Sequence, residues 1–211
     1  MAGVDYSAVA GVYRWLEFCV FGSGLQDARV GLLDDLLERV SHQSDPRVLL
    51  VGDGDGRFLE ELLLRVECVR VDYVDCSEGM MLEAQGRVGL DDRVSWACAD
   101  LFTWEELGYE VVVAHFLLDG FSGEARRRVI ERLVSKLRCG GLFLVSDFDS
   151  RASFYGRVMV CVMQVFFRMF AQVPFVDVCR ADAEFEALRG LMVSEKSWRR
   201  GWIYTQLWHI S

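Results

Sequence analysis

Apolar and polar residues follow one another along this chain in short blocks that predict strands and helices in alternation. Runs of strand length are separated by segments with the periodicity of an amphipathic helix, of which the clearest is Ser122–Leu137. The expected strands are Val48–Val51, Val69–Val74, Val94–Cys98, Glu110–Ala114 and Leu142–Phe148. Such alternation predicts a mainly parallel sheet with helices on both faces.

The two ends of the chain carry other patterns. An N-terminal helical region is expected over Val9–Val40, and a short helix is expected over Ala181–Arg189, where Gly190 ends it. The last two apolar runs, Met192–Trp198 and Trp202–His209, flank a turn and can pair as an antiparallel hairpin. The pattern therefore predicts an α/β fold whose sheet ends in an antiparallel pair of strands.

The most informative turn follows the first expected strand, where Gly52, Gly54 and Gly56 alternate with acidic residues. Each missing side chain lets the backbone approach a bound molecule, and the helix that follows offers unpaired N–H groups to a polar or anionic group. The dinucleotide fingerprint would place its third glycine where this chain has Arg57. A nucleoside-containing cofactor fits this turn, although a tight strand-to-helix turn without a ligand is also compatible with it.

An acidic residue ends the second expected strand. Asp75 would lie beside the glycine turn, where a doubly wound sheet holds a ribose and a carboxylate can accept from both ribose hydroxyls. Because Ser77 follows closely, Asp75 could instead help to cap the next helix, and both roles are compatible. Further along, Asp100 follows the third expected strand and His115 follows the fourth.

Together these segments resemble the class I S-adenosylmethionine-dependent methyltransferases over about Val48–Phe148. The resemblance rests on four features in order: the G-x-G-x-G turn, a D-x-S-x-x-M segment that ends at Met80, the A-D-h segment Ala99–Leu101, and the strand that leads to His115. It implies that Asp75 binds the ribose, that Met80 packs on the adenine, and that Asp100 accepts from the adenine amine. The terminal hairpin also resembles the antiparallel pair that ends the methyltransferase sheet.

The resemblance implies a Rossmann-like, doubly wound, mainly parallel seven-stranded sheet and S-adenosylmethionine as the cofactor. The cofactor-binding residues that it implies are Tyr13, Gly52, Asp53, Gly54, Asp75, Cys76, Met80, Asp100, Leu101 and His115. The chain is interpreted as one methyltransferase domain: a helical cap over 1–45, a cofactor-binding core over 46–150, a helical insertion or lid over 151–180, and a helix with the hairpin over 181–211. The expected activity is methyl transfer to a small, apolar or aromatic acceptor, as in enzymes of the ubiquinone and menaquinone biosynthesis type.

One position departs from the family pattern. The family usually carries an acidic residue two positions before the first glycine, and here that residue is Leu50. Asp53 or Asp55 could meet the methionine amino group of the cofactor instead. The departure also leaves open a degenerate methyltransferase fold that acts as a binding protein. An NAD-dependent oxidoreductase is a third alternative, which the glycine spacing and the hairpin disfavour.

No side chain is assigned as the catalyst, because positioning of a nucleophile against the sulfonium methyl in a dry site supplies most of the acceleration. His115, Asp119 and Asp147 stand where a general base could act, and His115 is the best candidate because histidine titrates near neutral pH. A structural or cofactor-binding role for His115 is equally compatible with the sequence. The acceptor, the methylated atom and the oligomeric state stay open.

Composition narrows the choice of partners. The chain of 211 residues has a formal net charge of −9 and a pI near 4.9, which disfavours binding to nucleic acid phosphates. Seven cysteines without a C-x-x-C pair indicate reduced thiols in the cytoplasm and no metal site. The apolar segment Phe154–Arg168 is too short for a membrane span and is interrupted by Arg157. We expect Phe154–Phe170 to cover the acceptor pocket as a lid, together with the region around Tyr6 and Tyr13, although a helix buried against the sheet is also compatible with this pattern.

Overall fold

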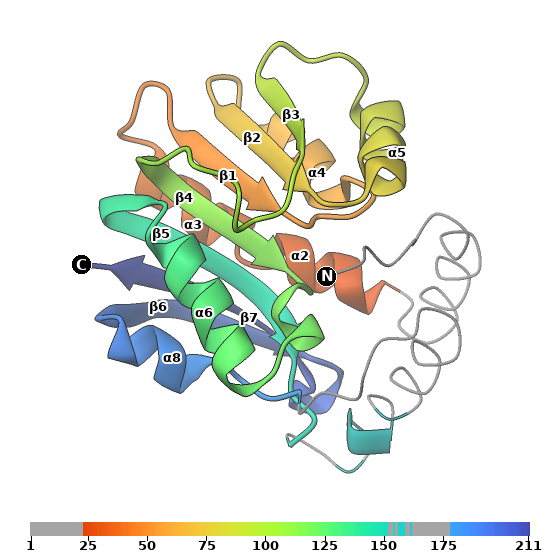
Figure 1. Ribbon diagram of the computed structural model, residues 1–211, viewed down its shortest axis with the longest axis vertical. Coiled ribbons are helices and arrows are strands. Elements are labelled where there is room, and N and C mark those ends of the chain that lie inside the picture. Colours follow the sequence, from red (N-terminus) through yellow and green to blue (C-terminus); the bar gives the residue numbers. More distant parts are fainter. Residues whose placement is uncertain (1–22, 152–153, 155, 159–160, 162–177) are drawn as a thin grey trace.

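Seven strands form one sheet in the order β3-β2-β1-β4-β5-β7-β6 (Figure 1). The structure is a computed structural model, and it describes residues 23–151, 154, 156–158, 161 and 178–211. The strands are β1 (Arg47–Val51), β2 (Arg70–Asp75), β3 (Val94–Cys98), β4 (Tyr109–His115), β5 (Leu137–Phe148), β6 (Gly190–Trp198) and β7 (Ile203–Ile210). β1 to β5 are parallel, and β7 runs antiparallel between β5 and β6. The expected mainly parallel sheet with an antiparallel terminal hairpin is confirmed.

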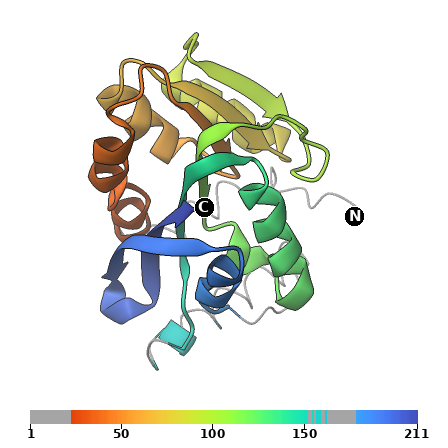
Figure 2. The same cartoon turned by 90° about the vertical axis from the view of Figure 1, so that its left-hand side faces the viewer.

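Helices cover both faces of this sheet. Those described are α2 (Gly24–Val30), α3 (Leu33–Val40), α4 (Arg57–Arg65), α5 (Glu78–Val88), α6 (Gly123–Val134) and α8 (Asp182–Ala187), with the 3₁₀ turns η1 (Leu118–Gly120) and η2 (Arg199–Gly201). α2 to α5 lie on one face, and α6 and α8 lie on the other (Figure 2). Among the described residues, none of the helices combines the length and the apolar character that a membrane crossing needs.

Alternation along each strand decides which helical layer its side chains meet. On β1, Leu50 belongs to the core on the α3, α4 and α5 face, together with Phe58 of α4. Leu49 points the other way and belongs to the core with Val129 of α6. Neither leucine has exposed surface, as expected for a parallel strand that is covered on both faces.

At two places strand pairing overrides the local pattern, and the expected bounds of a helix and of the strand that follows it are wrong at each. Leu137 continues the helical spacing of Leu133, yet α6 ends at Val134 and Leu137 begins β5, where it pairs with Tyr109 of β4. β5 is therefore longer at its start than the run 142–148. In the same way, the helix expected over 181–189 is shorter, and β6 begins at Gly190 instead of Met192.

The N-terminal helical region is described only in part. Between residues 23 and 40 it forms two helices, α2 and α3. The rest of the expected region, with Tyr6 and Tyr13, lies outside the described residues, as does most of the expected lid over Phe154–Phe170.

Gly56 shows how the fold holds the first turn in place. It has φ +76°, and a Cβ built on it would lie 2.8 Å from the Cβ and 3.0 Å from the Cα of Ala84 on α5. Its missing side chain therefore serves the contact between α4 and α5. The other two glycines of the turn do not have this contact with backbone atoms.

We expect Gly56→Ala to lower the free energy of unfolding by about 1–3 kcal/mol, because it adds a clash and a strained φ. The matched control is Gly86→Ala, whose new Cβ meets nothing within 4 Å on the exposed side of α5. That control should raise the stability by about 0.5–1 kcal/mol through helix propensity. Urea denaturation measures both, and equal effects would contradict close packing of Gly56 on α5.

Candidate active site

The strand order reverses between β1 and β4, and this point locates the candidate site. The chain leaves β1 toward β2 on one side, while β4 and β5 extend the sheet on the other. In open α/β sheets, ligands bind in the crevice at the carboxyl ends of the strands at such a reversal. Gly52 follows β1 and Phe116 follows β4, so the glycine turn and the end of β4 flank the crevice.

The glycine turn presents backbone rather than side chains to this crevice. Gly52 and Gly54 have φ values of +65° and +68°, a conformation that glycine adopts without strain. A Cβ on Gly52 would lie 3.1 Å from Leu117 Cδ1, and a Cβ on Gly54 would lie 3.2 Å from Met80 Cε. Leu117, from the segment after β4, and Met80 of α5 therefore close over the turn from two sides.

Asp75 ties this turn to the end of β2. Its carboxylate accepts from Ser77 N at 2.8 Å and from the backbone N–H of Gly54. Burial raises the pKa of Asp75 above its ordinary value, and the two backbone hydrogen bonds oppose this rise. The helix cap itself is Ser77, whose Oγ accepts from Met80 N at 3.3 Å. Asp75 is thus available beside the glycines and is not the cap of α5.

The end of β3 completes the same edge of the site. Asp100 is exposed, and one of its carboxylate oxygens accepts from Phe102 N at 2.8 Å. Leu101 packs against the core on the α6 face. Cys76 lies next to Asp75 and is exposed. The expected site residues of β2 and β3 therefore lie along one end of adjacent strands, whereas Tyr13 lies outside the described residues.

His115 is buried at the end of β4 and cannot act as an exposed base in this conformation. Its Nδ1 lies 2.8 Å from Ser146 Oγ, and its ring packs edge-on against Phe58 at 4.6 Å between centroids. Burial and the charge of Arg29 hold its pKa well below the ordinary value, so the ring is neutral at pH 7. Its Nε2 is buried and has no hydrogen-bond partner among the described residues.

Asp53 is the second buried group with an unsatisfied atom. Its Oδ2 accepts from Leu59 N at 3.2 Å at the start of α4, while its Oδ1 has no hydrogen-bond partner in the described part of the chain. Burial raises the pKa of Asp53 to about 7, and the Arg29 charge partly opposes the rise. Asp55, the other expected substitute for the missing acid, is engaged instead, because its Oδ2 accepts from Arg57 at 2.9 Å and from Arg87 at 2.8 Å.

With this geometry described, the chain can be compared with known proteins. Residues 49–143 match the family model described as Methyltransferase domain. This match spans the glycine turn, Asp75, Asp100 and His115, and it coincides with the sheet order given above. Residues 49–143 are therefore similar to a methyltransferase domain, and the fold is that of the class I methyltransferases. The resemblance drawn from the motifs is thereby confirmed.

The proteins that this chain resembles differ in what they do. A curated carboxy-S-adenosyl-L-methionine synthase from Nautilia profundicola is 24% identical over 114 residues, which are 54% of this chain and 48% of that protein. This chain thus matches about half the length of that relative. The magnesium protoporphyrin IX methyltransferase ChlM from Synechocystis, solved with bound S-adenosyl-homocysteine, has a TM-score of 0.74 at 18% identity over 99% of this chain and 97% of that one. The N-methyltransferase NodS from Bradyrhizobium japonicum has a TM-score of 0.60 at 17% identity over 86% of each chain.

Two carboxylates are neighbours near the carboxyl ends of β4 and β5: Asp119 lies in η1, which follows β4, and Asp147 lies near the end of β5. Asp147 accepts from Phe148 N at 2.8 Å and from Asp119 N at 3.0 Å, so it holds the turn η1 against the end of β5. Burial, with the neighbouring Asp119 charge, raises the pKa of Asp147 well above its ordinary value, and burial raises the pKa of Asp119 to about 7. Burial therefore favours the protonated form of both carboxyls, and Asp119, with a pKa of about 7, is partly ionised at neutral pH.

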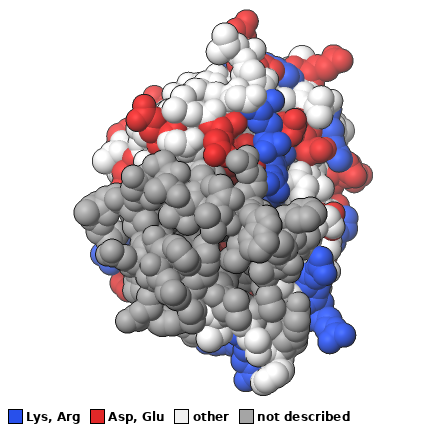
Figure 3. Space-filling view, turned by 90° about the vertical axis from the view of Figure 1, so that its right-hand side faces the viewer, with Lys and Arg blue, Asp and Glu red and all other residues white. Residues whose placement is uncertain are grey.

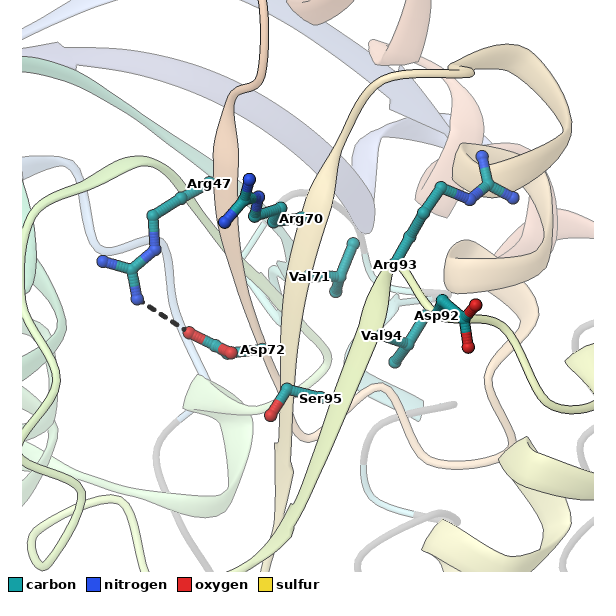
Figure 4. Close-up of a pocket in the computed structure, with 8 residues that line it drawn as sticks. All are labelled: Arg47, Arg70, Val71, Asp72, Asp92, Arg93, Val94 and Ser95. Atoms are coloured by element: carbon teal, nitrogen blue, oxygen red, sulfur yellow. Dashed lines mark hydrogen bonds and ion pairs between the residues drawn. The ribbon is translucent and has the colours of Figure 1, made fainter.

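A hollow at the opposite end of the sheet is not part of this site. Figure 4 shows it at the amino ends of β1 to β3, where three arginines line it. Each of them is paired: Arg47 with Asp72 at 3.1 Å, Arg70 with an aspartate at 2.6 Å, and Arg93 with an aspartate at 2.6 Å. In the upper part of the face in Figure 3, the described Lys and Arg side chains likewise lie among Asp and Glu. The described residues offer no group of three His, Cys, Asp or Glu that could hold a metal ion.

Sequence reasoning missed two residues of the site. Arg29 of α2 is buried, its guanidinium lies 5.1 Å from the ring centroid of Phe116, and its charge acts on Asp53 and His115. Phe116 has φ +53°, a left-handed conformation that is strained for a side chain of this size. This turn carries the chain from His115 to Leu117. Neither residue belongs to a motif, because the contacts join segments that are far apart in the sequence.

The raised pKa values predict how stability varies with pH. Because folded Asp119 binds its proton more tightly than unfolded Asp119, its contribution to stability is full below about pH 4 and is lost as pH rises through about 7. Asp119→Asn removes this loss and should raise the unfolding free energy at pH 8 by about 1–3 kcal/mol relative to the wild type, with little change at pH 4.

The control has the opposite sign. Hydrogen bonds from Arg93 lower the pKa of Asp91 to about 2, so Asp91→Asn should reduce stability at pH 8 and matter less toward pH 2. Urea denaturation at several pH values measures both variants. A pH profile of Asp119→Asn that runs parallel to the wild type would show that Asp119 titrates normally.

Proposed function

We propose that this protein is an S-adenosylmethionine-dependent methyltransferase that acts on a small acceptor. The observation that carries the proposal is the convergence of three features at the reversal between β1 and β4: the glycine turn, Asp75 beside it, and a buried unsatisfied oxygen of Asp53 beneath it. A cofactor with a ribose and a charged amino group complements these features.

The residues of the site fit this cofactor group by group. The ribose hydroxyls would donate to Asp75, and the adenine would lie along Met80 and Leu101 with its amine toward Asp100. The α-ammonium group would donate to Asp53 Oδ1, which otherwise stays buried without a partner. When bound, the cofactor supplies an electrophilic methyl group on a sulfonium. The protein residues bind it, orient it and exclude water.

Asp75→Ala tests the ribose assignment. We expect the affinity for S-adenosylmethionine and for S-adenosyl-homocysteine to fall by about 1–3 kcal/mol, because ribose hydroxyls lose their acceptor in a partly closed site. Isothermal titration measures this, with NAD as a ligand that should not bind. Ser77→Ala is the control, since it removes the α5 cap and leaves the carboxylate in place. An equal loss of affinity in both variants would mean that Asp75 acts only through the local fold.

Asp53 makes the binding depend on pH. Because an ammonium partner favours the carboxylate, and burial raises the pKa of Asp53 to about 7, binding below pH 7 must displace a proton. The affinity for S-adenosylmethionine should therefore fall by up to about tenfold per pH unit from pH 7 toward pH 5. Asp53→Asn should bind more weakly at pH 7 and lose this dependence. A wild-type affinity that is constant from pH 5 to 7 would remove Asp53 from the role of the missing acid.

A small, apolar or aromatic acceptor is the finer part of the proposal. It is supported by the acidic charge of the chain, which disfavours nucleic acid, and by the apolar residues Leu117 and Phe116 that follow β4 beside the glycine turn. The proton of the acceptor would pass to the ionised fraction of Asp119, whose pKa of about 7 suits a base near neutral pH. We place the protein in the cytoplasm, where its thiols stay reduced.

A binding protein with a degenerate methyltransferase fold is the second candidate, and buried Leu50 at the family's acidic position favours it. Turnover decides between the two. S-adenosylmethionine is incubated with a panel of small aromatic and apolar acceptors, and S-adenosyl-homocysteine is measured as the product. Tight cofactor binding without product from any acceptor would favour the binding protein.

A further inference from the structure

Two exposed cysteines meet at the edge of the site where β2 and β3 end. Cys76 directly follows β2, and Cys98 is the last residue of β3. Cys98 is the partner of Asp75 in the parallel ladder, and its Sγ lies 3.9 Å from the carbonyl oxygen of Cys76. The ladder continues one step further, since Ala99 N donates to Asp75 O at 3.0 Å. The two cysteines are therefore diagonal neighbours.

This spacing is compatible with a disulfide. A strand separation of about 4.8 Å and a rise of about 3.3 Å place the two Cα atoms about 6 Å apart. Disulfides span Cα distances of roughly 4.4–6.8 Å. The two thiols are also close enough for the charge of one to affect the titration of the other. Both cysteines are free in the structure.

We propose that Cys76 and Cys98 form a thiol pair that is oxidised by a peroxide to an intramolecular disulfide, and that this disulfide weakens cofactor binding. The first part stands on the geometry of the pair alone. The second part rests on the proposed function, because it assumes that the adenosine group lies between Asp75 and Asp100. Asp75 directly precedes Cys76, and Asp100 follows Cys98 two positions later.

The oxidation begins at Cys98. Partial desolvation of the Cys76 sulfur and the nearby charges of Asp75 and Asp100 raise the pKa of this thiol, which disfavours Cys76 as the first nucleophile. The Cys98 thiolate attacks one peroxide oxygen, the O–O bond breaks, and a sulfenic acid and hydroxide result. The Cys76 sulfur then attacks the sulfenic sulfur and displaces hydroxide. With the two thiol protons, both hydroxides leave as water, so two thiols and one hydrogen peroxide give one disulfide and two waters.

The disulfide would weaken cofactor binding by moving the segments that follow β2 and β3. It would draw Cys76 toward Cys98 and so move the segment that carries Asp75 and Ser77, which shape the ribose side of the site. Bound cofactor would in turn cover this edge and slow the reaction. The rate at which the pair is oxidised would therefore depend on whether cofactor occupies the edge of the site between Asp75 and Asp100.

The test uses the full chain treated with a small excess of hydrogen peroxide. Peptide mass spectrometry should find a Cys76–Cys98 disulfide that is reversed by a dithiol reductant. Phenylarsine oxide, which bridges two neighbouring thiols, should bind the reduced protein and should not bind Cys98→Ser or Cys76→Ser. The exposed Cys68 and Cys139 serve as controls, and Cys68→Ser and Cys139→Ser should leave both reactions unchanged.

Affinity for S-adenosyl-homocysteine is then measured before and after oxidation. We expect a loss of at least about tenfold in the wild type, recovery on reduction, and no loss on oxidation of Cys98→Ser relative to its own reduced form. Absence of the Cys76–Cys98 disulfide and of arsenical binding would overturn the thiol pair. A disulfide that leaves affinity unchanged would overturn its effect on binding. Failure of the reduced wild type to bind the ligand would instead count against the proposed function.

Discussion

The chain reversal at the end of β1 is the constraint on which the rest of the site depends. Gly52, Gly54 and Gly56 all have positive φ values, so the backbone turns without side chains between the sheet and the bound molecule. The three glycines meet different neighbours: Gly52 meets Leu117, Gly54 meets Met80, and Gly56 meets the backbone of α5. A substitution at Gly56 would move α5, and with it Met80 and the segment after Asp75. The turn therefore packs against both α5 and the segment that follows β4.

Buried polar groups around this turn are only partly satisfied by the protein. Asp53 and His115 each use one atom in a local hydrogen bond, to Leu59 N and to Ser146 Oγ, and each leaves another buried atom without a partner in the described residues. An unpaired buried acceptor costs about 1–3 kcal/mol, so such atoms are rare unless a ligand completes them. Arg29 lowers this cost for Asp53 through its charge. The site is therefore preorganised at the expense of stability in the absence of a ligand.

The sequence predicts the strands well because their apolar runs are short, separated by helical segments, and bounded by glycine and acidic residues. The order of the motifs also predicts the neighbours of β1, since Asp75 and His115 follow strands that pair on either side of it. The start of β5 could not be predicted, because Leu137 fits the spacing of α6 and only its pairing with Tyr109 makes it a strand residue. The roles of Arg29 and Phe116 depend in the same way on contacts that no local pattern contains.

Leu50 stands where the family pattern usually has an acidic residue, and the residues around it suit an apolar side chain. An acid at this position would lie in the core with Phe58, where its charge would need a partner. Leu50 instead buries an apolar side chain in this core. Among the described residues, Asp53 is the only carboxylate at the start of α4 with a buried oxygen that has no hydrogen-bond partner. Asp53 Oδ2 also accepts from Leu59 N in the first turn of α4, so the position of its carboxylate is tied to this helix. If cofactor binding requires an acid here, its affinity is tied to the first turn of α4, and a change that frays this turn should weaken binding before it unfolds the sheet.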